Sequence, residues 1–146
     1  MIKLKTFGGF MAGNDITSVQ EGTWRSEKLE KLFVYLAMNR NRGVCIEDIS
    51  EAIWQLDEDT DNPVGALKNL AYRLRKALRD TSFDEECIVS VRGGLYKWND
   101  DVEVTIDVEE FDGYINEAEL AFSRSKETAI ESYEKAIALY NGDFLP

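Results

Sequence analysis

Leucines recur along one side of a cationic segment between Pro63 and Arg79. The spacing of Leu67, Leu70, Leu74 and Leu78 is that of an amphipathic helix. The opposite side and its flanks carry Lys68, Asn69, Tyr72, Arg73, Arg75, Lys76 and Arg79. A helix seated in a DNA major groove needs this division, because one face anchors it while the other reaches phosphates and base edges. Taken alone, the pattern would favour a solvated basic helix face.

The individual side chains on this helix suggest different DNA contacts. An amide can pair bidentately with adenine and a guanidinium with guanine, whereas simple cations suit phosphates. We therefore assign Asn69, Tyr72 and Arg73 to base edges. Lys68, Arg75, Lys76 and Arg79 are assigned mainly to phosphates.

Two short apolar runs follow the helix, at residues 88–91 and 95–98, and Arg92-Gly93-Gly94 separates them. This arrangement predicts a β-hairpin with Arg92 near its tip. Glycine allows close backbone approach, and arginine suits a narrow, A/T-rich minor groove. An arginine beside two glycines can equally be an ordinary turn, so this signal is weak on its own.

The remaining segments complete an α+β pattern. Residues 2–7, 10–11 and 16–19 read as short strands of a meander, and a helix capped by Ser26 continues to Met38. A second helix opens at Glu47 and Asp48. The order of meander, three helices and hairpin is that of a winged helix-turn-helix with an N-terminal antiparallel β-meander and a C-terminal wing.

Beyond Asp101 the sequence predicts a brief extended stretch and two amphipathic helices, at residues 108–122 and 128–140. The second helix is expected to bury Ala129, Ile130, Tyr133, Ala136, Ile137 and Tyr140. Phe144 and Leu145 have no following element to cover them, so we expect a truncated second domain.

The net charge of −11 is unevenly distributed. Residues 1–100 hold 14 Lys and Arg against 16 Asp and Glu, a net −2, whereas residues 101–146 hold 3 against 12, a net −9. A local basic face can therefore bind phosphates despite the acidic total. The sequence has no signal peptide and no apolar run of roughly 20 residues, and Cys45 and Cys87 form no CxxC pair, which favours a cytoplasmic protein without a membrane partner.

Enzymatic and metal-binding interpretations have little support. The chain has no histidine, no P-loop, no dinucleotide motif and no metal-ligand spacing, so we expect no enzyme and no cofactor. The acidic loop at residues 57–62 imitates the first half of a calcium loop, but Lys68 replaces the essential twelfth carboxylate. Trp24, Trp54 and Trp98 each flank an apolar element, so core packing is expected.

Several segments resemble a known family. They are Phe7-Gly8-Gly9-Phe10, Trp24-Arg25-Ser26-Glu27-Lys28, Arg73-Leu74-Arg75-Lys76-Ala77-Leu78 and Val91-Arg92-Gly93-Gly94-Leu95-Tyr96. Together they resemble the DNA-binding domain of OmpR/PhoB-type regulators, and most closely the antibiotic regulatory protein (SARP) branch. Residues 105–111 and 133–146 resemble the start of the bacterial transcriptional activator domain. Leu95 departs from the family pattern, which has a glycine at that position of the wing.

The resemblance implies a domain organisation and partners. Residues 1–100 would be the winged-helix domain, and residues 101–146 the first helices of a tetratricopeptide-like activator domain. Such proteins bind double-stranded DNA, often as two molecules on direct repeats, through the recognition helix and a wing that here includes Arg92 and Gly93. They contact RNA polymerase through the loop before the recognition helix, which here carries Asp57, Glu58, Asp59 and Asp61. A solvated acidic loop is an equally good interpretation of that segment.

Two other functions fit the same sequence. The basic helix could bind an acidic protein, which would make the chain an interaction or scaffold module. The chain could also be the output fragment of a larger signalling protein. Salt-dependent affinity for duplex DNA would separate the first of these from a transcriptional regulator.

Overall fold

The computed structural model describes residues 1–54, 63–83, 86–91 and 93–145. Its N-terminal sheet contains β1 (Ile2–Lys5), β2 (Met11–Gly13), β3 (Ser18–Gln20) and β6 (Val104–Ile106), in the order β3-β2-β1-β6. The first three strands pair antiparallel, which confirms the predicted meander. β6 lies parallel to β1, with Ile2 opposite Val104. This pairing was not predicted, because it joins strands that are distant in the sequence.

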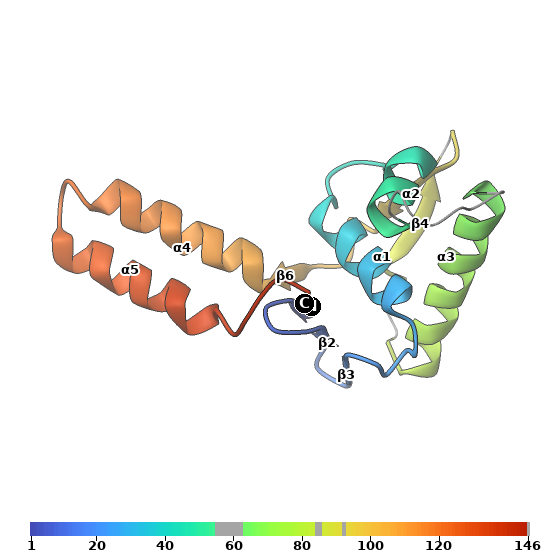
Figure 1. Cartoon of the computed structure of the whole chain (residues 1–146), viewed down its shortest axis with the longest axis horizontal. Coiled ribbons are helices and arrows are strands. Elements are labelled where there is room, and N and C mark those ends of the chain that lie inside the picture. Colours follow the sequence, from blue (N-terminus) through green and yellow to red (C-terminus); the bar gives the residue numbers. More distant parts are fainter. Residues whose placement is uncertain (55–62, 84–85, 92, 146) are drawn as a thin grey trace.

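Three helices lie on one side of this sheet (Figure 1). They are α1 (Glu27–Met38), α2 (Ile46–Trp54) and α3 (Pro63–Asp80). The predicted cap of α1 is confirmed, because the Ser26 hydroxyl accepts a hydrogen bond from the Leu29 N–H at 3.4 Å. The α2 helix begins one residue earlier than predicted. Ile2 and Leu4 point inward from β1 and are fully buried, whereas Lys3 and Lys5 face solvent.

The core is rich in aromatic side chains. The Phe33 ring lies 5.4 Å from that of Trp24 and 5.2 Å from that of Trp98, measured between centroids. Trp24 and Trp98 are buried, and Trp54 is half-buried against the same core. The prediction that the tryptophans serve packing is therefore confirmed.

The predicted wing is an antiparallel hairpin of β4 (Ile88–Val91) and β5 (Leu95–Trp98). Val44, in the link between α1 and α2, bridges to Tyr96 through two backbone hydrogen bonds of 2.7 and 3.0 Å. The base of the wing is thereby fixed to the helical core.

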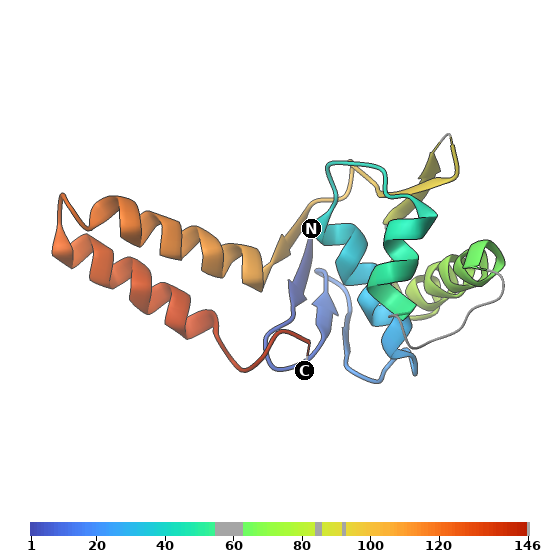
Figure 2. The same ribbon diagram turned by 45° about the horizontal axis from the view of Figure 1, so that its top comes forward.

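A two-helix hairpin of α4 (Asp107–Ala121) and α5 (Lys126–Leu139) projects from the sheet on the side away from α3 (Figures 1 and 2). Small side chains fill the space between the two helices: Ala118, Ala129, Ser132 and Ala136 are buried. The prediction that Ile130, Ile137 and Tyr140 are buried was wrong. Their exposed fractions are 54%, 69% and 52%. Ile130 and Ile137 lie on the solvent side of α5, whereas Tyr140 follows the helix and its ring lies 5.4 Å from that of Phe7 between centroids.

The segment after α5 returns to the N-terminal sheet (Figure 2). The Gly8 N–H donates to the Asp143 carbonyl and the Leu145 N–H to the Thr6 carbonyl, each at 2.8 Å. Leu145 is half-buried against the core, while Phe144 stays 44% exposed. Leu145 is therefore covered by elements that precede it in the chain, and the expectation of a truncated second domain stays a prediction.

Candidate nucleic-acid interface

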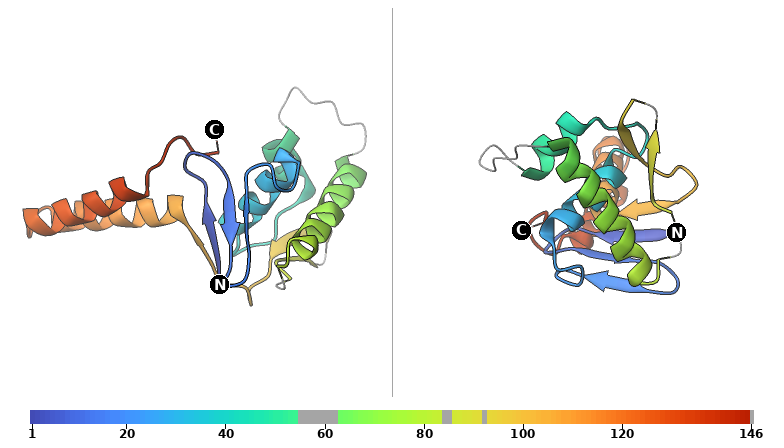
Figure 3. Two further views of the ribbon diagram at one scale, coloured as in Figure 1. Left: turned by 90° about the horizontal axis from the view of Figure 1, so that it is seen from below. Right: turned by 90° about the vertical axis from the view of Figure 1, so that its right-hand side faces the viewer.

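The α3 helix lies on the surface opposite the α4–α5 hairpin, and Figure 3 shows it crossing the side of the domain. Its predicted apolar stripe is confirmed, because Leu67, Leu70, Leu74 and Leu78 are all buried. Ala71 also lies within this stripe and is 2% exposed. Burial of four leucine side chains orients the helix by the hydrophobic effect, so the opposite face must point to solvent.

The outward face of α3 presents most of the residues that the sequence singled out. Lys68, Asn69, Tyr72, Arg73, Lys76 and Arg79 are all exposed. The Tyr72 side chain is 60% exposed. From Pro63 to Asp80 the helix carries five cationic side chains and one carboxylate, a net +4 in a chain of net −11. This concentration of donors and positive charge forms one continuous surface.

One ion pair partly neutralises this surface. The Lys76 ammonium lies 3.2 Å from the Asp80 carboxylate one turn later, and both side chains are largely exposed. Exposed pairs of this kind contribute at most about 1 kcal/mol and are easily exchanged. Lys76 can therefore leave Asp80 for a phosphate at little cost.

Arg75 occupies a different environment from its neighbours. It is half-buried, and its guanidinium donates to the Ile88 carbonyl at 3.4 Å and to the Ser90 hydroxyl at 3.3 Å. Its Nε atom is buried without a hydrogen-bond partner in the described part of the chain. The sequence assigned Arg75 mainly to phosphates; the structure places it between α3 and β4, where it connects α3 to the wing.

The turn of the wing depends on its glycines. Gly93 and Gly94 have φ values of 85° and 73°, in the left-handed region that favours glycine. Both are exposed, and an added Cβ atom at either position would meet nothing within 4 Å. Arg92 lies outside the described residues. The same holds for the acidic loop residues Asp57, Glu58, Asp59 and Asp61.

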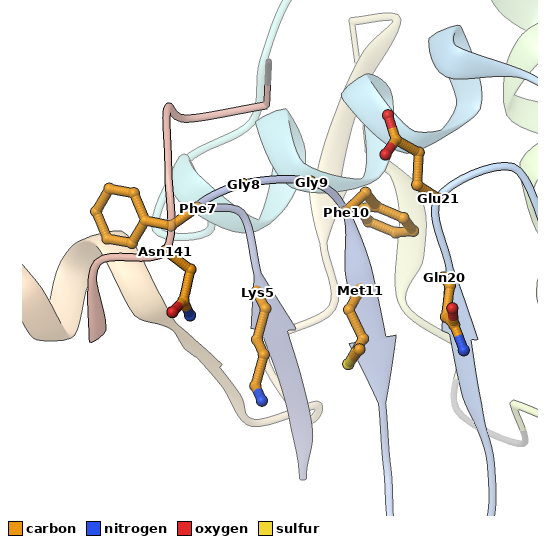
Figure 4. Close-up of a pocket in the computed structure, with 9 residues that line it drawn as sticks. All are labelled: Lys5, Phe7, Gly8, Gly9, Phe10, Met11, Gln20, Glu21 and Asn141. Atoms are coloured by element: carbon orange, nitrogen blue, oxygen red, sulfur yellow. The ribbon is translucent and has the colours of Figure 1, made fainter. Parts of the chain in front are cut away.

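A shallow pocket lies on the solvent face of the sheet, far from α3 (Figure 4). Lys5, Met11 and Gln20 project from neighbouring strands, and Asn141 closes one end. The lining mixes one cation, one carboxylate and two amides, without a convergent set of polar groups. Within the described ranges, no group of three or more His, Cys, Asp or Glu side chains could hold a metal ion. No helix among those residues is long and apolar enough to cross a bilayer.

Comparisons with known proteins agree with this geometry. With 20% identity and a TM-score of 0.74, the fold resembles that of Mycobacterium tuberculosis EmbR, solved in complex with a low-affinity phosphopeptide. The alignment covers 99% of this chain but only 37% of the EmbR chain. The fold of this chain also resembles the C-terminal domain of the nisin resistance regulator NsrR, a lantibiotic response regulator. The identity is 24% and the TM-score 0.50, over 68% of this chain and 93% of the NsrR domain.

A search of curated proteins found no match. The family described as "Transcriptional regulatory protein, C terminal" matches residues 20–98, from the end of β3 to the end of the wing. This is more than half of the chain, and it includes α3 and both strands of the hairpin. The chain therefore belongs to this family of transcriptional regulatory domains.

Proposed function

We propose that the chain is a sequence-specific DNA-binding regulator that places α3 in the major groove and the wing in the minor groove. The observation that carries this proposal is the solvated cationic face of α3. It combines four exposed cationic side chains with Asn69 and Tyr72. Phosphate contacts supply affinity, and the amide and guanidinium groups supply base readout.

Each residue of this surface has a distinct proposed role. Asn69, Tyr72 and Arg73 read base edges, whereas Lys68, Lys76 and Arg79 contact phosphates. Arg75 is held beside β4, so it reaches a phosphate only where the DNA backbone passes between α3 and the wing. Arg92 and Gly93 form the minor-groove contact.

The architecture further supports a SARP-like activator. The α4–α5 hairpin follows the winged helix directly, as the helices of the activator domain do in that group. We infer that residues 1–100 are the DNA-binding unit and that residues 101–146 begin the activator domain. Two copies would then bind direct repeats, and the acidic loop with Asp57, Glu58, Asp59 and Asp61 would contact RNA polymerase.

The central test is fluorescence anisotropy of the chain with a pool of random duplexes at two salt concentrations. We expect binding that weakens with salt, because each neutralised phosphate releases counterions. On a duplex selected from that pool by the wild-type protein, Arg73→Ala should weaken binding roughly tenfold, within the range of one lost bidentate contact. Arg124→Ala is the matched control, because it removes the same charge from an exposed position between α4 and α5.

The outcome separates the two classes of function. Equal losses for Arg73→Ala and Arg124→Ala would show that only overall charge matters. No binding at low salt by the folded protein would refute autonomous DNA recognition and favour a protein-interaction module. The polymerase contact has its own test: Asp57→Lys with Asp59→Lys should abolish activation in vitro while leaving DNA affinity intact.

A further inference from the structure

The C-terminal end of α3 has a well-defined cap. The Phe83 N–H donates to the Leu78 carbonyl at 2.9 Å and the Ser82 N–H to the Arg79 carbonyl at 3.1 Å. These two bonds, with Ser82 at a φ of 67°, form a Schellman motif. Phe83 and Leu78 are both buried. Thr81 follows the last residue of α3 and precedes Ser82, where the chain leaves the helix.

Thr81 connects this end of α3 to two other parts of the fold. Its hydroxyl donates to the Ala77 carbonyl at 2.6 Å and accepts from the Trp24 indole N–H at 3.2 Å. Its carbonyl accepts from the Thr17 hydroxyl at 2.9 Å. One residue thus joins the helix end, the loop before α1 and the β2–β3 turn (Figure 1).

Both partners of Thr81 are themselves held in place. Trp24 is 8% exposed, and its ring lies 5.3 Å from that of Phe10 between centroids. Thr17 belongs to a turn in which the Asn14 side-chain oxygen accepts from the N–H groups of Ile16 and Thr17, at 2.9 and 2.8 Å. Such Asx turns restrict the backbone. The end of α3 is therefore hydrogen-bonded to two residues, Trp24 and Thr17, whose own positions are held by packing and by a turn.

We propose that Thr81 is a positioning residue for DNA recognition by α3, an inference that rests on the proposed function. The leucine stripe holds the helix mainly by the hydrophobic effect, which is non-directional. Hydrogen bonds have strict distance and angle requirements. The bonds that Thr81 makes to Trp24 and Thr17 fix the axial position of α3, on which the register of Asn69 and Arg73 with base edges depends.

The test compares Thr81→Val with Thr81→Ser. Valine keeps the branched shape and removes the hydroxyl, whereas serine retains the hydroxyl. The probes are a duplex selected from a random pool by the wild-type protein and a scrambled duplex of the same composition. We expect Thr81→Val to bind the selected duplex roughly fivefold more weakly, because binding must then restore a helix position that the lost hydrogen bond to Trp24 holds in the free wild-type protein. Affinity for the scrambled duplex should stay unchanged, and Thr81→Ser should restore specific binding.

Ser125→Ala serves as a matched control for general loss of stability. It removes a hydroxyl that caps α5, where the Thr128 N–H donates to it at 3.3 Å, on the hairpin remote from α3. All affinities are measured at a temperature where every variant is folded. We expect Ser125→Ala to bind both duplexes like the wild type. Equal losses in Thr81→Val and Ser125→Ala would overturn the positioning role.

Hydrogen exchange gives a readout that does not require DNA. Thr81→Val should increase exchange in the last turn of α3, and Thr81→Ser should not. Unchanged exchange would overturn the anchoring role whatever the DNA result. Specific binding that survives in Thr81→Val would overturn the positioning role alone. Absence of specific binding by the wild-type protein would instead refute the proposed function, and with it any role of Thr81 in DNA binding.

Discussion

Asp107, the first residue of α4, accepts hydrogen bonds from both the backbone and the side chain of Thr6. Its carboxylate lies 2.9 Å from the Thr6 N–H nitrogen and 2.6 Å from the Thr6 hydroxyl. The same carboxylate also accepts from the N–H groups of Phe7 and Val108, at 3.0 and 2.9 Å. Because Asp107 is 7% exposed, these bonds are largely shielded from water. The carboxylate therefore joins the helical hairpin to the end of β1.

Asp107→Asn should destabilise the protein by about 3 kcal/mol, because the new amide would direct its own N–H groups at buried donors. Urea unfolding would show the loss as a lower midpoint. Asp112→Asn is the control, since Asp112 is an exposed carboxylate on the same helix. Equal midpoints for the two variants would show that the junction is not held by this carboxylate.

The local helices, strands and turns of this fold could be predicted from the sequence, whereas the contacts between distant segments could not. The leucine stripe of α3 and the glycine turn of the wing follow from spacing within a few residues. The pairing of β6 with β1 and the role of Asp107 depend on segments that only the folded chain brings together. The sequence around Asp107 does not indicate that its carboxylate will accept hydrogen bonds from Thr6 and Phe7.

A periodic pattern identifies a helix face but not what covers it. Ala129 and Ala136 were predicted to be buried and are, while Ile130 and Ile137 share the same periodicity and are exposed. In the candidate site, exposure of Asn69 and Arg73 followed from the leucine positions. The environment of Arg75 did not, because it depends on where β4 packs.

The end of α3 offers a stabilising substitution. Ser82 adopts a φ of 67°, which costs a residue with a side chain roughly 1 kcal/mol. Ser82→Gly should therefore raise the free energy of unfolding by about 1 kcal/mol, reduced somewhat by the greater freedom of glycine in the unfolded chain. Thermal unfolding would show this as a higher midpoint. Ser82→Ala retains the strained backbone and should give no gain; a gain equal to that of glycine would contradict the explanation.

Glu30 should make stability depend on pH. It is 4% exposed, and its pKa is raised above 4.5, mainly by burial, with smaller contributions from the negative charges of Glu21 and Glu27. A hydrogen bond from the Gly22 backbone opposes this rise. Because the folded state holds this proton more tightly than the unfolded state, stability decreases as pH rises above 4.5.

Glu30→Gln removes this ionisation and keeps an oxygen for the Gly22 N–H. We expect the variant to be more stable than the wild type near pH 7 and equal to it near pH 3, where Glu30 is protonated in both the folded and the unfolded state. Unfolding midpoints measured across this range test the sign. An advantage that persists unchanged at the lower pH would show that it does not arise from titration of Glu30.

The base of the wing depends on a close contact between Gly43 and Leu95. A Cβ atom added at Gly43 would lie 2.9 Å from the Leu95 Cδ1 atom, 3.2 Å from its Cβ atom and 3.3 Å from the Val91 Cγ2 atom. Leu95 stands where the resembling family has a glycine in its wing, so Gly43 supplies the space that this leucine needs. Gly43→Ala should push the hairpin outward and destabilise the protein, at a cost typical of overpacking, about 1–3 kcal/mol.

The compensating change is Leu95→Gly, which frees the space that the new Cβ atom needs. In the Leu95→Gly background, Gly43→Ala should lower the free energy of unfolding by less than it does in the wild-type protein. The difference between the two losses is the coupling free energy, which we expect to be about 1 kcal/mol. Urea unfolding of the four proteins measures this coupling. Strictly additive losses would mean that the two residues do not compete for the same space.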